Sequence, residues 1–351
     1  MSAEQPKPGT PAPVDSAPAE RIRLEHGSGG ALSRQLMEDV IHPVFRGDAY
    51  PELSDATPVE IGSDYLLTTD GYVVDPPFFP GGDIGRLSVF GTCNDLAVCG
   101  AKPICISLAL ILEEGFAVAD LRRVLASAAA AAREANARVV TGDTKVVPSG
   151  RGGGIYVTTS GLGQRVFPHP LSPKRIRAGD RVIVSAPLAA HGLTVLAARQ
   201  SLPGAGRVRS DVAFLYPLVS RLFHLGAGLR FMRDATRGGV AAVLNETASG
   251  AGWGIEVEET SFPVAEEVRS ICDLLGLNPL EVANEGVFVM VVEAGCESAA
   301  LDALHSHPLG RGAATVGTVS GARPGAVLMR TRIGGTRLLD FPRGLLLPRI
   351  C

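Results

Sequence analysis

The chain has 351 residues, of which 46% are apolar and 20% are charged, and its formal net charge is -3. Single hydrophobic cores rarely grow beyond about 250–300 residues, so a globular chain of this length is expected to form two domains. The charge gives no electrostatic reason to expect nucleic acid or an anionic membrane as a partner. The longest apolar stretch, residues 104–112, is far shorter than the roughly 20 residues that a membrane helix needs.

Residues 1–20 are rich in proline, alanine and polar residues and contain no apolar centre of a signal peptide. We expect this segment to be a disordered tail in a cytoplasmic protein. The six cysteines have neither the spacing of a disulfide framework nor that of a zinc site. The sequence therefore predicts free thiols, with no disulfide and no structural metal.

Helix and strand patterns alternate from about residue 60, which predicts mixed α/β domains. In the first half we expect strands over 65–69, 104–112, 138–142 and 155–161, and helices over 85–98 and 117–136. In the second half we expect a turn followed by a strand within 179–185, helices from Asp211, Arg237 and Glu297, and a strand over 287–292. The proline-rich segment 167–174 is typical of a linker. We predict an N-terminal domain over 21–170, a C-terminal domain over 175–340, and a mobile tail over 341–351.

Five aspartates stand where these patterns put the end of a strand or the start of a helix, and glycine occurs in the motifs around most of them: Asp55, Asp70, Asp95, Asp143 and Asp234. Carboxylate oxygens and glycine-rich turns with exposed amides suit magnesium-bound triphosphate. A single Asp-Gly pair is more often a plain turn. The interpretation as a magnesium–triphosphate site therefore depends on the occurrence of five such aspartates in one chain. The chain has neither a P-loop nor a dinucleotide-binding glycine fingerprint.

Three further features fit either chemistry or an ordinary structural role. The segment His26–Gly30 reads as a flexible linker or as a lid of backbone amides over phosphates. Lys145, directly after the Asp143 turn, could neutralise phosphate charge, and Glu285 could be a general base. Each of these two residues could equally be a solvated surface charge.

Cys351 is the last residue of the chain, and Pro342 and Pro348 exclude a regular helix before it. Chain ends are mobile unless they are tied down, so such a thiol could reach into an active site and out again. The alternative is a frayed end that happens to stop at cysteine. Arg349 would favour the thiolate, whereas the terminal carboxylate opposes it.

Together these motifs resemble those of the HypE family of hydrogenase maturation factors. The resemblance rests on His26–Gly30, Thr69–Gly71, Phe79–Gly85, Gly91–Ala97, Gly100–Pro103, Thr141–Val146, Asp234–Gly239, Ala283–Gly286 and the ending Pro348–Cys351. It extends over residues 21–351, and the motifs occur in the family's order.

The resemblance implies a two-domain fold like that of aminoimidazole-ribonucleotide synthetase, in a homodimer that pairs through its N-terminal domains. It implies ATP and magnesium as cofactors. The implied magnesium ligands are Asp55, Asp70, Asp95 and Asp234. The residues implied to contact the nucleotide are His26, Gly27, Ser28, Gly29, Gly30, Asp70, Asn94, Asp143, Thr144 and Asp234. Cys351 is the implied carrier thiol, and Lys145 and Glu285 are implied to take protons from the substrate amide.

The implied reaction is the ATP-dependent dehydration of a carbamoyl group on Cys351 to a thiocyanate. A carbamoyltransferase, HypF, would load the thiol, and the HypC–HypD complex would receive the cyanide for the nickel–iron centre of a hydrogenase. Two other readings stay open. One is another ATP-using enzyme of the same superfamily, such as a selenophosphate synthetase or an amidine-forming ligase. The other is a non-catalytic thiol carrier, which would have no use for a triphosphate site.

Overall fold

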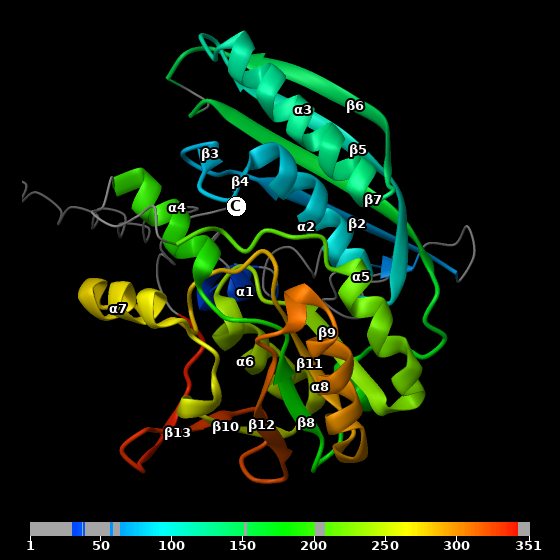
Figure 1. Cartoon of the computed structure of the whole chain (residues 1–351), viewed down its shortest axis with the longest axis vertical. Helices are drawn as coiled ribbons and strands as arrows, with labels where there is room; N and C mark the ends of the chain where they lie inside the picture. Colours follow the sequence, from blue (N-terminus) through cyan, green and yellow to red (C-terminus); the bar gives the residue numbers. More distant parts are fainter. Residues whose placement is uncertain are drawn as a thin grey trace, which may run out of the picture.

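The computed structural model describes residues 30–36, 38, 57–58, 64–150, 153–200 and 208–342. These residues form two β-sheets, each with its own helices, stacked one above the other in Figure 1. The predicted two-domain, mixed helix-and-sheet fold is confirmed. The five described cysteines, Cys93, Cys99, Cys105, Cys272 and Cys296, are free thiols. No helix of the described residues is long and apolar enough to cross a membrane.

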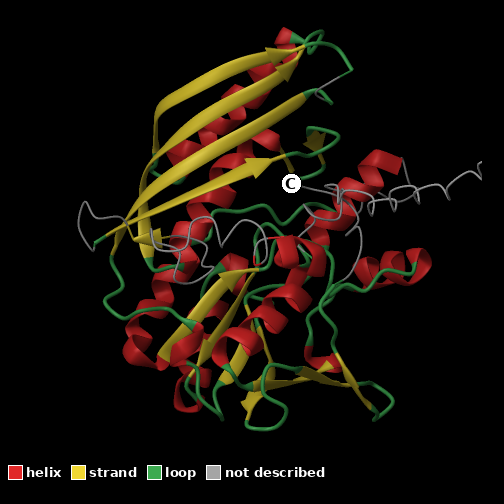
Figure 2. Ribbon diagram, turned by 180° about the vertical axis from the view of Figure 1, so that it is seen from behind, coloured by secondary structure: helices red, strands yellow, loops and turns green. Residues whose placement is uncertain are grey.

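The N-terminal sheet has five strands in the order β1-β2-β7-β5-β6. Their bounds are β1 Thr57–Pro58, β2 Tyr65–Tyr72, β5 Ala101–Glu113, β6 Arg138–Val147 and β7 Ile155–Arg165. Only β5 and β6 pair in parallel, and helix α3 connects them. Helices α2 (Ile84–Val98) and α3 (Val118–Glu134) cover one face of this sheet, whereas no described element covers the other face (Figure 2).

The second sheet has seven strands in the order β14-β13-β10-β12-β8-β11-β9. Their bounds are β8 Arg181–Val184, β9 Leu229–Asp234, β10 Gly254–Glu258, β11 Phe288–Val292, β12 Ala314–Ser320, β13 Val327–Arg330 and β14 Thr336–Leu338. The remaining described helices are α1 Ala31–Leu36, α4 Ala190–Gln200, α5 Tyr216–Val219, α6 Gly239–Ala251, α7 Glu266–Leu275 and α8 Glu297–His305. A short separate ladder joins β3 (Phe78–Phe79) and β4 (Gly82–Asp83).

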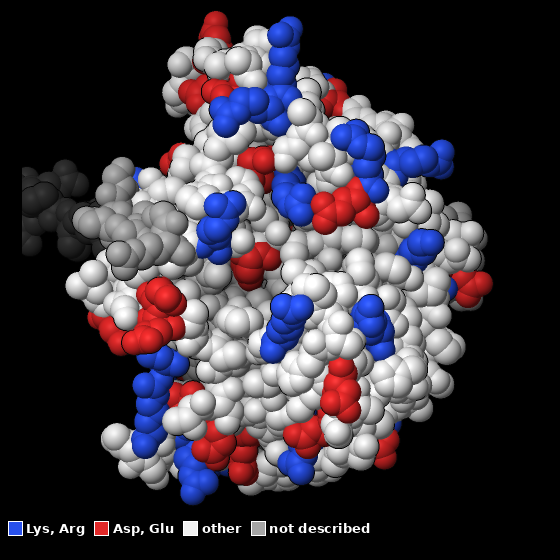
Figure 3. Space-filling view, in the orientation of Figure 1, with Lys and Arg blue, Asp and Glu red and all other residues white. Residues whose placement is uncertain are grey.

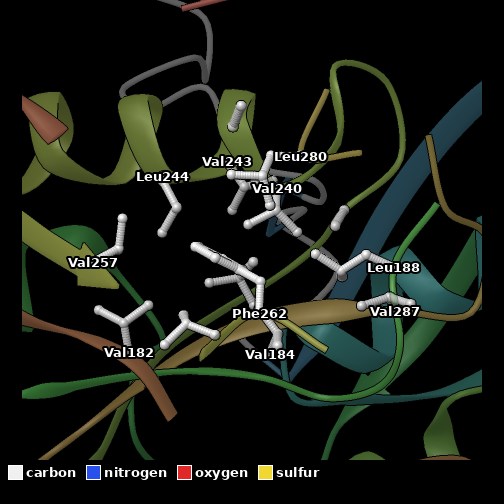
Figure 4. Packing of buried hydrophobic residues seen from close by; sticks show 14 of the residues in the cluster. Val182, Val184, Leu188, Val240, Val243, Leu244, Val257, Phe262, Leu280 and Val287 are labelled. Atoms are coloured by element: carbon white, nitrogen blue, oxygen red, sulfur yellow. The ribbon is translucent and has the colours of Figure 1, made fainter. Parts of the chain in front are cut away.

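Both faces of the second sheet are buried at strand β11, which has no exposed residue, whereas strand β14 at the sheet edge is exposed. On one face Val182 and Val257 of the sheet pack against Val240 and Leu244 of α6, with Phe262 in the middle of the cluster (Figure 4). The other face packs against α5 and α8. Such a doubly covered sheet is a rigid support for the loops at its edge, where Asp234 ends β9.

The two sheets are joined by a buried amide rather than by the linker alone. Asn94 of α2 donates from Nδ2 to the carbonyl of Ala213 at 2.9 Å and accepts at Oδ1 from the amide of Leu215 at 2.8 Å. Beside it, Val212 and Phe214 pack into the core of the N-terminal domain. Residues 212–214 therefore belong to the second domain in sequence and to the first domain in packing.

Three local predictions are wrong. Asp211 does not begin a helix: the chain has no regular secondary structure there, and the next helix begins at Tyr216, with a proline in its first turn. Asp70 and Asp143 lie within strands rather than after them, because β2 and β6 continue to Tyr72 and Val147. Strand β2 continues because the Tyr72 side chain is buried in the core and its backbone still pairs with Val157.

Candidate functional site

Acidic side chains from both domains meet where the two sheets face each other. Asp70 comes from β2 and Asp95 from the last turns of α2. Asp234 ends β9, and Glu285 lies in the loop before β11. Figure 3 shows acidic side chains in the hollowed middle of this face, with basic ones around them. We call Asp70, Asp95, Asp234 and Glu285 the acidic centre.

The N-terminal domain holds its two carboxylates by short local contacts. Thr68 donates its hydroxyl to Asp95 Oδ2 at 2.9 Å, and the amide of Gly71 donates to Asp70 Oδ1 at 2.8 Å. Arg237, which follows Asp234 in the other domain, lies 3.9 Å from Asp70 Oδ1. Because about half of the arginine side chain is exposed, this contact adds little stability, but it brings the two domains' charges together.

A buried chain of hydroxyl groups lies beneath Asp70 and Asp95. The hydroxyl of Tyr72 contacts that of Thr92 at 3.1 Å, Thr92 contacts Thr159, and Thr159 donates to the carbonyl of Ser88 at 3.2 Å. Burial raises the pKa of Tyr72 well above its usual range, and the nearby charges of Asp70 and Asp95 raise it further. Tyr72 is therefore neutral and serves to fix α2 against β2.

In the second domain Asn284 sets the position of Glu285. Asn284 is fully buried, accepts at Oδ1 from the amide of Ala189 at 2.7 Å, and donates to the carbonyl of Ala235 at 2.8 Å. Its own amide also donates to Ala235, at 3.1 Å. Because Ala235 directly follows Asp234, these bonds place Glu285 beside the end of β9. The sequence motif around Glu285 contained Asn284, but its role as a clamp was not predicted.

Glu285 is a buried carboxyl among other carboxylates. Burial raises its pKa well above the ordinary range, and the charges of Asp234, Asp211 and Asp70 raise it further, whereas Arg237 lowers it. A carboxyl in this setting binds a proton far more readily than a surface glutamate. Carboxyl groups with shifted pKa values are common at catalytic sites, where the pKa of a base must suit the proton that it accepts.

Asp211 is a second functional candidate that the sequence did not reveal. Its carboxylate accepts the amides of Glu285 and Gly286 at 3.3 Å. Burial raises the pKa of Asp211 to about 6, although these backbone hydrogen bonds lower it. The sequence pattern predicted only that a helix begins at this residue.

Asp143, Thr144 and Lys145 lie apart from the acidic centre in this chain. All three are exposed on β6, the edge strand, and Lys145 Nζ contacts Asp143 Oδ2 at 2.6 Å. A hydrogen bond from Lys145 and one from the amide of Thr144 lower the pKa of Asp143. Gly142 pairs with Leu108 on the helix-covered face, so strand alternation directs Asp143 and Lys145 to the open face.

Several predicted site residues lie outside the described residues: His26, Gly27, Ser28, Gly29, Asp55 and Cys351. Gly30 is described and is buried, directly before α1. The amide of Ala31 donates to the carbonyl of Pro342 at 3.1 Å, and Asn245 of α6 donates to the carbonyl of Leu339 at 3.1 Å. The start of the C-terminal tail is thus fixed to α6 and α1. Within the described ranges, no three side chains of the metal-binding types are grouped closely enough to hold an ion.

His191, at the start of α4, lies fully buried beside this region. Its Nδ1 contacts the hydroxyl of Ser210 at 2.8 Å, and its ring meets Phe79 edge-on at 5.2 Å. Nε2 has no hydrogen-bond partner among the described residues. Burial lowers the pKa of His191 from 6.5 to about 3, so the folded protein holds the ring neutral at neutral pH.

This shift predicts a specific dependence of stability on pH. The unfolded chain protonates His191 below pH 6.5 and the folded chain does so only near pH 3, so stability is lost as the pH falls between these values. Between pH 7 and pH 5, the wild type should lose about 2 kcal/mol more unfolding free energy than His191→Gln. Urea unfolding at the two pH values measures this difference. Equal losses in both proteins would show that the folded state does not exclude the charged ring.

Comparison with known proteins identifies relatives along nearly the whole chain. Residues 53–164 match the N-terminal domain of AIR synthase related proteins, and residues 177–329 match their C-terminal domain. The carbamoyl dehydratase HypE of Rhodobacter capsulatus is 46% identical over 335 residues, which cover 95% of this chain and 98% of that protein.

Solved structures agree with this relationship. A structure described as a HypE–HypF complex contains a chain that is 40% identical, superposes with a TM-score of 0.83, and covers 88% of this chain and 99% of that chain. A HypE structure in complex with ATP is 42% identical, with a TM-score of 0.79 and coverage of 93% and 99%.

Proposed function

The chain belongs to the HypE family of carbamoyl dehydratases, and from this we propose that it dehydrates a carbamoyl group on its own Cys351, at the expense of ATP, during hydrogenase maturation. The observation that carries the proposal for this chain is the buried Glu285 beside Asp234, facing Asp70 of the other domain. A charged, partly enclosed centre between two domains suits phosphoryl transfer, which depends on positioning and electrostatic stabilisation.

The reaction uses ATP to turn a poor leaving group into a good one. The oxygen of the S-carbamoyl group attacks the γ-phosphorus of ATP, and ADP leaves. The carbon–oxygen bond then breaks, inorganic phosphate leaves, and the amide nitrogen loses both of its protons, which gives a thiocyanate on sulfur. Glu285 accepts one of these protons, because a buried carboxylate near other acids is a strong base, and the second leaves on the phosphate as hydrogen phosphate.

The tail of the chain carries the substrate to this centre. Leu339 and Pro342 are fixed to α6 and α1, and nine residues, 343–351, follow them. An extended segment of that length spans at most about 30 Å. Tethering replaces a separate binding site and makes the chemical step effectively unimolecular. The resemblance gives Cys351 as the carrier, and sulfur suits the role because it attacks as a thiolate and leaves readily.

The residues of the acidic centre fit a magnesium–ATP complex by their chemistry, although no three of the described side chains are grouped closely enough to hold the ion without its phosphates. Their carboxylates are hard oxygen donors, which magnesium prefers. The charges of Asp234 and Asp70 raise the pKa of Glu285 and Arg237 lowers it only in part, so the acidic centre carries a surplus of negative charge. Magnesium usually takes a few carboxylates together with substrate phosphates, so Asp70, Asp95 and Asp234 would hold it, together with Asp55 from outside the described residues. When bound, the ion neutralises charge on the phosphates during transfer. His26–Gly30, Asn94, Asp143 and Thr144 complete the proposed nucleotide contacts.

A second copy of the chain pairs with the open face of the N-terminal sheet. Leu67 is 44% exposed and Ile111 40% exposed on that face, so their pairing would remove apolar surface from water. Lys145 lies on the same face and contacts Asp143 rather than the acidic centre. Lys145 can therefore take a proton from the substrate amide only if the pairing of two chains places it near the substrate.

The relative solved in complex with HypF supports HypF as the protein that loads Cys351. The relative solved with ATP supports ATP as the phosphoryl donor. The family resemblance adds the HypC–HypD complex as the acceptor of the cyanide.

The function is tested by measuring phosphate release from ATP in the presence and absence of HypF and carbamoyl phosphate. We expect turnover that requires the carbamoyl donor and stops when magnesium is omitted, after correction for phosphate released by HypF alone. Turnover that is independent of the donor would favour a soluble-substrate enzyme of the same superfamily. No turnover in an otherwise active mixture would favour a thiol carrier without chemistry of its own.

A further inference from the structure

Asp211 is a buried carboxylate for which the proposed reaction so far has no use. It follows Ser210, whose amide donates to the carbonyl of Pro80 at 2.9 Å and whose hydroxyl contacts His191. The segment is thereby held between α4 and the β3–β4 turn. Asp211 itself faces the loop that carries Glu285.

The contacts of Asp211 are directed at the backbone of that loop. Both carboxylate oxygens accept the amide of Glu285, and Oδ2 also accepts the amide of Gly286, each at 3.3 Å. A buried amide without a partner is costly, so these bonds fix the two peptide units that flank the Cα atom of Glu285. The amide of His191 donates to the same carboxylate, which ties the loop to α4.

Gly286 shows how closely the loop approaches this segment. A Cβ atom at Gly286 would lie 1.9 Å from the carbonyl oxygen of Asp211, so no other residue fits without moving the backbone. Asn284 fixes the preceding residue against Ala189 and Ala235. These two anchors hold the backbone of Glu285 from both sides. They therefore fix the position of its Cα atom, from which the side chain extends beside Asp234.

We propose that Asp211 is a positioning residue for the dehydration step, which holds the backbone of Glu285 so that its carboxylate meets the amide protons of the carbamoyl group. This inference rests on the proposed role of Glu285. A shift of about 1 Å in a reacting group can cost on the order of 100-fold in rate, so a group that acts only through the backbone can still have a large effect.

The test compares Asp211→Asn with the wild type in a single turnover of the carbamoylated protein. Asparagine keeps the volume and one acceptor oxygen. Its NH2 group replaces the second oxygen and cannot accept a hydrogen bond from the backbone amides of Glu285 and Gly286. We expect the rate of water loss to fall by about 10–100-fold, while the KM for ATP and the extent of carbamoyl loading stay unchanged. Asp180→Asn is the matched control, since Asp180 is also buried and accepts a backbone amide, from Arg177 at 2.8 Å.

A double variant separates positioning from a general structural effect. If Asp211 acts through Glu285, then Asp211→Asn combined with Glu285→Gln should be no slower than Glu285→Gln alone. Effects that multiply, or an Asp211→Asn protein as fast as the wild type, would overturn the inference. A wild-type rate in Glu285→Gln would instead refute the proposed role of Glu285. If Asp211→Asn does not fold, Asp211→Glu, whose carboxylate is displaced by one methylene, gives the same two outcomes.

Discussion

Replacing Cys351 with alanine should abolish both carbamoyl loading and thiocyanate formation, while ATP binding is retained. The account gives the chain no other acceptor for the carbamoyl group. Burial raises the pKa of Cys93 to about 12 and that of Cys272 to about 11, so both remain thiols at neutral pH. The thiolate is the nucleophile, and these two groups cannot replace Cys351.

Cys296→Ala is the matched control for this experiment. Cys296 is partly buried in the short turn before α8, remote from the acidic centre, and its removal should leave loading unchanged. Peptide mapping after incubation with HypF, carbamoyl phosphate and ATP measures loading, and calorimetry measures ATP binding. Loading of Cys351→Ala to the wild-type extent would place the carrier thiol elsewhere in the chain.

Replacing Glu285 with glutamine should slow dehydration by about 100- to 10,000-fold, the usual contribution of a general acid or base. Glutamine fills the same space beside Asp234 and leaves the backbone contacts of Asp211 and Asn284 intact. It cannot accept a proton at neutral pH. The expected loss therefore appears in the rate of water loss and not in carbamoyl loading.

Glu281→Gln provides the comparison, because Glu281 lies in the same loop and accepts a hydrogen bond from Asn278 at 2.8 Å. It should dehydrate at nearly the wild-type rate. Quenched-flow mass analysis of the carbamoylated protein gives both rates. A Glu285→Gln protein within about threefold of the control would mean that another group takes the proton, because a general base contributes far more than that.

Much of the fold was predictable because long helices and strands with a regular pattern of apolar residues can be recognised from the local sequence alone. The alanine-rich helix predicted over 117–136 is α3, Val118–Glu134, and the buried strand predicted over 104–112 is β5, Ala101–Glu113. The strand predicted over 287–292 is β11, Phe288–Val292. In each, local preference and burial favour the same structure.

The parts that were missed depend on contacts between distant residues. Nothing near Asp211 in sequence indicates that its carboxylate binds amides 74 and 75 residues away. Likewise, Asp70 and Asp143 looked like strand ends because each stands beside glycine, which is a poor strand former. Pairing of β2 with β7 and of β6 with β5 overrides that local preference.

For the candidate site, Asp70, Asp95, Asp234 and Glu285 were all candidates in the sequence analysis. The structure places them together where the two domains meet. The sequence could not show that Asp143 and Lys145 lie on the other face of the N-terminal sheet, because strand register decides the face. Of these residues, Glu285 is tested by the variants above, and the roles of the others stay predictions.

The most direct test of the account is the mass of the intact protein and of its C-terminal peptide after incubation with HypF, carbamoyl phosphate and ATP, with and without magnesium. We predict that the C-terminal peptide first gains the mass of a carbamoyl group and then, only with magnesium and ATP, loses the mass of one water. A carbamoyl group that never loses water, or no gain on Cys351 while HypF is active, would contradict the account.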